Sequence, residues 1–155
     1  EHYDTNLKVF PPLRTQTDRA ALIEGLQSGI ISAITSNHQP ETIENKRCEF
    51  DLAAFGAAGI EAFFGALWQS LHSALSLEQL ILLIAHQPRK ILGLDVPVIG
   101  ANSYAELTLF DPDCHWELNK ADLNSKAANY PYLNRPLKGK PLGIINKGAA
   151  VLHHL

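Results

Sequence analysis

The feature that most constrains the fold is an apolar, β-branched run at residues 30–36, with the sequence IISAITS. It follows a helical pattern that ends at Gly29, and it leads directly into a polar loop at residues 36–41, SNHQPE. A short apolar run bounded by turn residues is typical of a strand that is covered on both faces, as in a parallel sheet. One parallel strand cannot form a sheet alone, so we expect the rest of that layer to come from residues outside this sequence.

The segment before this run is predicted to be helical. Two prolines at residues 11 and 12 exclude a helix there, and Thr17 then fits an N-cap, with Asp18 in the first turn. Gly29 fits the end of the helix. The inner stripe of this helix is expected to consist of Ala21, Leu22, Gly25 and Leu26.

Two further helices are predicted after the polar loop. Residues 42–56 are charged and indicate a long loop with room for one short helix. Residues 57–74 are apolar enough for a helix of about five turns. A capping box from Ser76 to Gln79 predicts the start of the next helix, which stops near Pro88. A final helical turn at residues 89–94, RKILGL, fits after it, with Gly93 as a C-cap.

After Asp95 the pattern changes to a period of two residues. The stretch AELTLFDPDCHWEL places Leu107 and Leu109 inside and Thr108 outside. PLGIINKGAAVLHHL alternates in the same way around a turn at residues 146–148. Such alternation is typical of antiparallel strands, so we predict a small β module at this end of an α/β chain.

Composition and charge exclude several classes of protein. The 155 residues are 46% hydrophobic, which is enough for a core, and the net charge of −3 gives no footprint for nucleic acid or an anionic membrane. Cys48 and Cys114 lack CxxC spacing, which fits a reducing cytoplasm. The chain starts at Glu1 and contains no methionine, so we expect it to be a piece of a longer or processed protein.

The polar loop at residues 36–41 is the candidate site. Ligands of α/β proteins bind at the carboxyl ends of buried strands, but Asn and Pro also favour plain turns, so the pattern alone leaves site and turn open. His38 has no partner at metal-ligand spacing, and Ser36 lies on no nucleophile elbow. We therefore predict no metal site made wholly within this chain.

The order of motifs along the chain resembles the last part of a dihydroorotase, of the form related to hydantoinases in the metal-dependent amidohydrolase superfamily. The landmarks are YDTNLKVFPPLR, the DRAALIEGL helix, the loop SNHQPE in place of Asp-His-Ala-Pro-His, EFDLAAFGAAGIE, AELTLFDPD and GIINKGAAV. The resemblance implies that residues 1–94 are the C-terminal end of a (β/α)8 barrel. It implies that residues 95–155 are the β-rich module that closes such enzymes.

The resemblance also implies a chemistry. Enzymes of this family open or close the cyclic amide of dihydroorotate in pyrimidine biosynthesis, with zinc as the cofactor and a metal-generated hydroxide as the nucleophile. An aspartate after the eighth barrel strand acts as the general base. An asparagine before a double proline, a second histidine in the Asp-His loop and the Phe-Gly backbone hold the substrate.

Three family positions differ in this chain. Asn37 stands at the catalytic aspartate, Phe10 at the substrate asparagine and Glu41 at the second histidine. An amide cannot accept a proton at neutral pH, phenylalanine offers no hydrogen bond, and a carboxylate repels an anionic substrate. The residues that do match are His38, Pro40, Phe55 and Gly56. The His-x-His metal motif of the first barrel strand is absent from the sequence.

Three hypotheses follow from the resemblance. The first is a non-catalytic dihydroorotase homologue in the cytoplasm, a homo-oligomer that supports aspartate carbamoyltransferase and binds no zinc through this chain alone. The second is part of an active zinc enzyme whose metal ligands lie outside this sequence. The third is a related cyclic amidase whose pocket is reshaped by Phe10 and Glu41. All three imply an N-terminal barrel half as the immediate partner.

Overall fold

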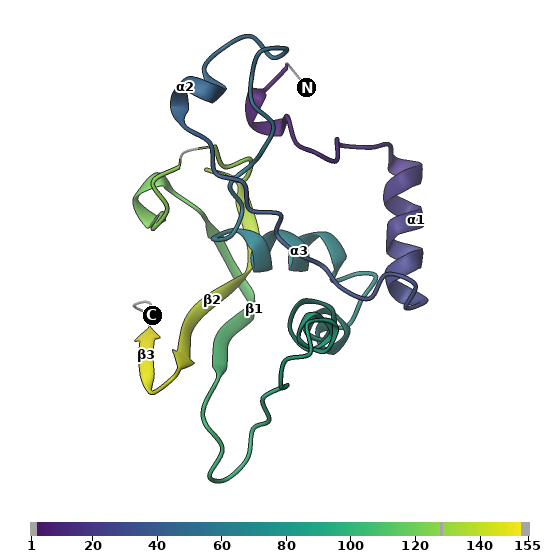
Figure 1. The fold of residues 1–155 in the computed structure, drawn as a ribbon, viewed down its shortest axis with the longest axis vertical. Helices are drawn as coiled ribbons and strands as arrows, with labels where there is room; N and C mark the ends of the chain where they lie inside the picture. Colours follow the sequence, from purple (N-terminus) through teal and green to yellow (C-terminus); the bar gives the residue numbers. More distant parts are fainter. Residues whose placement is uncertain (1–2, 128, 153–155) are drawn as a thin grey trace.

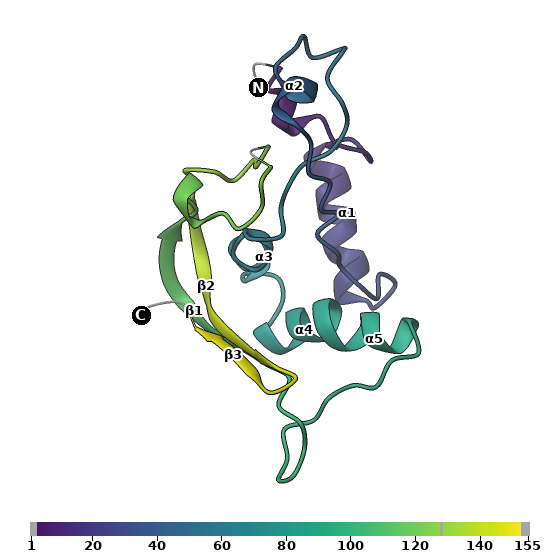
Figure 2. The same cartoon turned by 60° about the vertical axis from the view of Figure 1, so that its left-hand side comes forward.

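The structure is a computed structural model that describes residues 3–127 and 129–152. Helices and loops fill the first two thirds of the chain, and a curved sheet follows (Figure 1). Turned by 60°, the molecule shows α3, α4 and α1 on one side of the sheet (Figure 2). The α-helices are α1 Gln16–Gln27, α2 Ile43–Lys46, α3 Phe63–Leu71, α4 Leu77–Ile81 and α5 Gln87–Ile91. Short 3₁₀ turns are η1 Thr5–Leu7 and η3 Lys120–Asp122, and η2 Leu82–His86 is a π-helical turn.

The C-terminal sheet confirms the antiparallel prediction. Its strands are β1 Leu107–Glu117, β2 Pro136–Asn146 and β3 Ala149–Leu152, in the order β1-β2-β3. The predicted turn between β2 and β3 is confirmed, with positive φ angles of 49° at Lys147 and 78° at Gly148. Two successive residues with positive φ angles suit a type I′ hairpin turn, whose twist matches that of the strands.

The prediction of a strand at residues 30–36 is wrong for this structure. None of these residues is in a strand, and the backbone amide of Ile34 donates instead to the carbonyl of Leu83 at 3.0 Å. The one parallel pairing nearby is an isolated bridge between His38 and Ala57. A strand exists only where a neighbour pairs with it along its length, and no described segment lies alongside this run to do so.

Helix α1 begins two residues earlier than predicted. Its N-cap is Thr15, not Thr17, because Asp18 closes a capping box with Thr15. Gly29 follows the helix with a φ of 76°, as a stop signal should. Of the predicted stripe, Gly25 is buried but Leu22 is 55% exposed, so the stripe was partly wrong.

The predicted helix at residues 57–74 is confirmed only for α3. Residues 57–59 are not helical because their amides and carbonyls are used elsewhere. The carbonyl of Ala57 accepts from Gln39, and the amide of Ala58 donates to the carbonyl of Asn129. The amide of Gly59 donates to the imidazole of His38.

The next helix begins as predicted, with a capping box between Ser76 and Gln79. It does not stop at Pro88, because the π-helical turn η2 leads directly into α5. A π turn offsets the backbone, which lets a proline without an amide hydrogen continue the helical path. Gly93, with a φ of 67°, is the predicted terminator, and the bond from Leu94 to the carbonyl of Arg89 completes a Schellman motif.

Two apolar clusters form the core. The first joins Ala58 and Ala62, near α3, to three residues of the C-terminal half: Leu118, Tyr130 and Leu137. The second lies between α3 and α4 and consists of Leu71, Leu75, Leu80 and Leu83. In β1, Thr108 is exposed as predicted, but Leu109 is 43% exposed rather than inside. In the part of the chain described, no helix has the length and apolar character needed to cross a membrane.

Candidate functional site

Three segments of the chain meet at one end of the molecule, beside α2. The amide of Gly56 donates to the carbonyl of Lys8 at 2.9 Å, and that of Gln39 donates to the carbonyl of Ala57 at 2.9 Å. The N-terminal segment, the polar loop and the segment around Gly56 are therefore joined by backbone bonds. All five predicted site residues lie on these segments: Phe10, Asn37, Glu41, Phe55 and Gly56.

Asn37 is held by its side chain. It has a positive φ of 43°, a conformation that asparagine tolerates better than most residues. Its Nδ2 donates to the backbone carbonyl of Phe10 at 3.0 Å. The amide therefore acts as a donor to the segment that carries Phe10, and neither of its side-chain atoms can take a proton at neutral pH.

Phe10 and Phe55 form an exposed aromatic pair. Their ring centroids lie 6.2 Å apart with an interplanar angle of 81°, an edge-to-face contact. The side chains remain largely in solvent, with Phe10 67% exposed and Phe55 53% exposed. The Lys8 ammonium lies 4.8 Å from the Phe55 centroid, a cation–π contact. This end of the molecule thus presents a wall of two rings and one cation.

Gly56 can only be glycine in this arrangement. Its φ is 131°, and a Cβ at this position would lie 2.9 Å from the carbonyl oxygen of Gln39. The close approach lets the polar loop lie directly on the Gly56 backbone. One oxygen of the neighbouring Glu41 carboxylate, Oε2, accepts from Asn45 Nδ2 at 2.9 Å.

His38 faces the backbone that follows Gly56. Its Nδ1 accepts from the amides of Gly59 and Ile60 at 3.1 and 3.3 Å. With Nδ1 engaged, only Nε2 remains for any other contact. Among residues 3–127 and 129–152, no group of three or more His, Cys, Asp or Glu side chains could hold a metal ion. Zinc sites need three or four such ligands, so the donors described here do not fit a zinc site by themselves.

Two buried polar residues that hold this site were missed from the sequence. The side-chain oxygen of Asn129, which is 3% exposed, accepts from the amide of Glu41, and its Nδ2 donates to the carbonyls of Gln39 and Gly56. Lys46 is 6% exposed and bonds to three backbone carbonyls. Nothing local marks either residue, because all but one of their partners lie 38 or more residues away along the chain.

A carboxylate next to the site is also held in place. Glu61 accepts hydrogen bonds from the Tyr130 hydroxyl and from the amide of Ser125. Burial alone would raise the pKa of Glu61, but these bonds, with His38 nearby, bring it below the usual value. Burial and the bond to Glu61 raise the pKa of Tyr130 to about 12. The pair therefore consists of an ionised carboxylate and a neutral phenol at pH 7.

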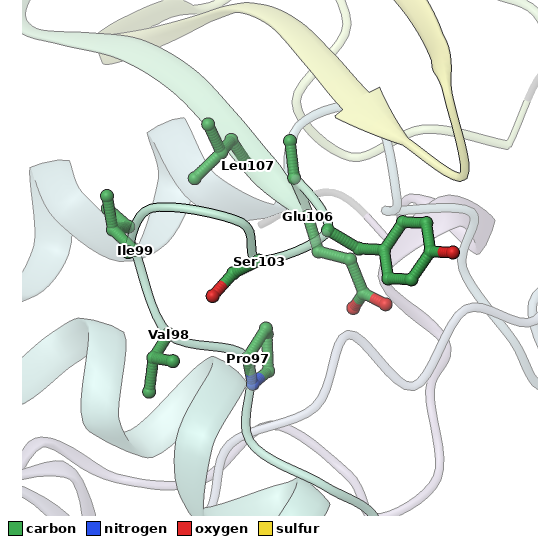
Figure 3. A pocket seen from close by; sticks show the side chains of 9 residues that line it. Pro97, Val98, Ile99, Ser103, Glu106 and Leu107 are labelled. Atoms are coloured by element: carbon green, nitrogen blue, oxygen red, sulfur yellow. The ribbon is translucent and has the colours of Figure 1, made fainter.

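The loop before β1 lines a separate small cavity of about 160 Å³ (Figure 3), at the end of the molecule opposite to α2 (Figures 1 and 2). Val98 and Ile99 line it, and their exposure is 70% and 90%. Its one carboxylate, Glu106, is paired with Arg89 at 2.7 Å. Because its single carboxylate is paired, this cavity offers no free charged group for catalysis.

The fold is that of hydantoinase-type proteins. An L-hydantoinase (dihydropyrimidinase) from Arthrobacter aurescens superposes with a TM-score of 0.86 at 25% identity, over 97% of this chain and 35% of that one. A D-hydantoinase gives a TM-score of 0.82 at 22% identity, over 96% and 34%. No protein-family model matches the chain.

The sequence comparison is more specific. The chain is 39% identical to a dihydroorotase of Chlorobaculum tepidum over 149 residues, 95% of this chain and 34% of that protein. It is 38% identical to a dihydroorotase of Pelotomaculum thermopropionicum over 152 residues, 97% and 36%. The chain is thus a dihydroorotase homologue over nearly its whole length, and the resemblance read from its motifs is confirmed. It spans about a third of the length of these relatives.

Proposed function

We propose that this chain is a dihydroorotase-type segment of pyrimidine biosynthesis whose substrate end no longer catalyses cyclic amide hydrolysis. The observation that carries the proposal is Asn37. At the position of the family's general base stands an amide, and its nitrogen is committed to the Phe10 carbonyl at 3.0 Å. A group that cannot accept a proton cannot serve as the base.

The two other divergent positions support the same reading. Phe10 turns an aromatic ring toward Phe55 where the family offers an amide to substrate. Glu41 places a negative charge where the family has a histidine that holds the substrate, and this charge would repel an anionic substrate. Substrate binding and proton transfer are both weakened, while His38, Pro40, Phe55 and Gly56 keep the family pattern.

We propose that the first 94 residues complete a (β/α)8 barrel with an N-terminal barrel half, the immediate partner. The exposed apolar side chains at the β2–β3 end of the sheet support a partner segment that covers them. Ile144 and Val151 are paired neighbours on one face and are 49% and 59% exposed. Leu152, on the other face beside Gly143, is 61% exposed. A sheet with apolar residues exposed on both faces is built to be covered on both.

The two edge strands of the sheet, β1 and β3, differ in how well they could pair with a further strand from the partner half. The outer edge of β1 carries Asp111, Pro112 and Asp113, which discourage further pairing. β3 reads AAVL, with no charge and no proline, and all four residues are exposed. The β3 edge is therefore the one suited to a strand from the partner half. In this arrangement any zinc ligands would come from that half.

A second function is an active zinc-dependent dihydroorotase, or a related cyclic amidohydrolase, with its metal ligands in the other half. The observation that favours it is the 39% identity to a protein named dihydroorotase. In a related amidohydrolase the ring pair of Phe10 and Phe55 would select a less polar substrate than dihydroorotate.

The test is a chimera in which this chain replaces the matched third of the Chlorobaculum tepidum dihydroorotase. We expect zinc content and melting temperature close to those of the parent, with turnover of dihydroorotate lowered by about 10²–10⁴-fold, the usual contribution of a general base. Turnover within tenfold of the parent at equal zinc content would contradict the proposal and favour the active enzyme. A tenfold difference in turnover corresponds to about 1.4 kcal/mol in activation free energy.

We further propose that the protein supports aspartate carbamoyltransferase as a non-catalytic subunit in the cytoplasm. The support is the resemblance to inactive dihydroorotase-like chains that assemble in this way. The check is size-exclusion chromatography of the purified protein with the aspartate carbamoyltransferase of the same organism. A shared peak of higher mass is expected, and separate elution of the two proteins at micromolar concentration would contradict the assignment.

A further inference from the structure

Lys46, the last residue of α2, is a buried cation that the proposed chemistry does not use. It is 6% exposed. Its Nζ donates to the carbonyls of Ala54 at 2.8 Å, Thr5 at 2.9 Å and Lys8 at 3.4 Å. Its own carbonyl accepts from the hydroxyl of Thr5 at 2.7 Å. The three ammonium protons are thus all directed at backbone oxygens of two other segments.

The charge of Lys46 is balanced by carbonyl dipoles rather than by an ion pair. The ion pairs of the described residues do not include it. Burial lowers its pKa, which the nearby charges of Glu41 and Asp4 oppose and that of Lys8 assists. A buried ammonium without a carboxylate is costly, and it is tolerated here because each proton has an acceptor.

The three acceptors lie on the two segments that carry the aromatic pair, each before the ring residue of its segment. Lys8 lies two residues before Phe10, and Ala54 lies directly before Phe55. The carbonyl of Lys8 also accepts from the amide of Gly56, so this oxygen ties both segments together. Lys46 therefore fixes the backbone on which both rings are mounted.

The two apolar core clusters do not supply this support. Neither core cluster includes a residue from 3–15 or from 41–56 among those described. The segments that carry Phe10 and Phe55 are held mainly by polar bonds, and Lys46 contributes three of them. Loss of its ammonium should release these segments and leave the rest of the fold intact.

We propose that Lys46 is a positioning residue, which holds the Phe10–Phe55 wall of the candidate site in its edge-to-face geometry. This proposal rests on the proposed function in one respect: it assumes that the Phe10–Phe55 wall lies where the substrate would bind. It concerns the position of the rings, so it holds whether the site is vestigial or active.

The test is Lys46→Met, which keeps the length of the side chain and removes all three donors. The matched control is Lys90→Met, the same change at an exposed lysine. Amide exchange by NMR should accelerate at Gly56 by about tenfold or more, as expected when bonds to a charged group are lost. The nuclear Overhauser effects between the rings of Phe10 and Phe55 should disappear. The amides of Ala66 and His72, in and after α3, should exchange as in the Lys90→Met control.

Two outcomes would overturn the proposal. Unchanged exchange at Gly56 with the ring contacts intact would show that Lys46 positions nothing. Equal acceleration at Gly56, Ala66 and His72 would show a general loss of stability rather than local positioning. If Lys46→Met does not fold, Lys46→Gln, which keeps two neutral donors, replaces it. The same changes in amide exchange and ring contacts are then expected, but smaller. Neither readout involves turnover, so failure of this proposal and failure of the proposed function are separate results.

Discussion

Asn37→Asp, introduced into the chimera with the Chlorobaculum tepidum dihydroorotase, should raise dihydroorotate turnover by about 10²–10⁴-fold over the unmodified chimera. The reason is that aspartate restores a group able to accept a proton where the amide now only donates to Phe10. The gain should decline as the pH is lowered through the pKa of the new carboxyl group, because only the carboxylate acts as a base. Steady-state kinetics at a series of pH values from about 8 down to about 4, near the ordinary aspartate pKa of about 3.9, measure both effects.

The matched control is Gln39→Glu. Gln39 is an exposed residue of the same loop, and the change from amide to carboxylate is chemically the same. It alters the local charge equally but places the carboxylate away from the position of the base. A comparable gain from Gln39→Glu would mean that net charge, not proton transfer, is the cause. No gain from Asn37→Asp at full zinc content would mean that another group limits turnover.

The other two divergent positions should act mainly on substrate binding. Adding Phe10→Asn and Glu41→His to Asn37→Asp restores a hydrogen-bonding amide and removes a negative charge that repels the substrate. We expect a lower KM at similar kcat, because the family resemblance assigns these positions to substrate binding rather than to proton transfer. A kcat that changes as much as KM would show that they also act on the transition state.

Features decided by neighbouring residues were predictable from the sequence. The capping box of Ser76 and Gln79 needs only a hydroxyl and an amide three residues apart. The turn before β3 and the C-cap at Gly93 need only residues that tolerate positive φ. The N-cap of α1 was misplaced because Thr15 and Thr17 are equally good caps, and the partner carboxylate of Asp18 decided between them.

Features decided by distant residues were not predictable. The apolar run at residues 30–36 has the composition of a strand, but a strand needs a neighbour that this chain does not place beside it. The first residues of the predicted helix at 57–74 were diverted by His38 and Asn129. The residues of the candidate site also divide into those predictable from the sequence and those set by distant partners. Its residues were recognised from motifs, whereas Lys46 and Asn129 bond to partners 41 and 88 residues away.

The contact between α3 and β2 leads to a large stability effect that we expect from one methyl group. Gly139 of β2 has a φ of 85°, and a Cβ there would lie 2.9 Å from Phe64 Cε1 and 2.9 Å from Trp68 Cδ1. On the facing helix, a Cβ at Gly65 would lie 3.1 Å from the Gly139 carbonyl oxygen. That oxygen also accepts from the indole of Trp116 at 2.9 Å. Helix and strand are therefore in contact at two glycines, with no space for a side chain.

Gly139→Ala should lower the free energy of unfolding by about 2–5 kcal/mol, from about 1–2 for a left-handed backbone and about 1–3 for overpacking. Gly93→Ala separates the two causes, because Gly93 has a similar φ of 67° but no atom within 4 Å of its Cβ position. It should cost only the backbone part, about 1–2 kcal/mol. Urea denaturation of both variants measures the difference. Equal losses would mean that Phe64 and Trp68 move aside freely, and that α3 is not held against the sheet by this close contact.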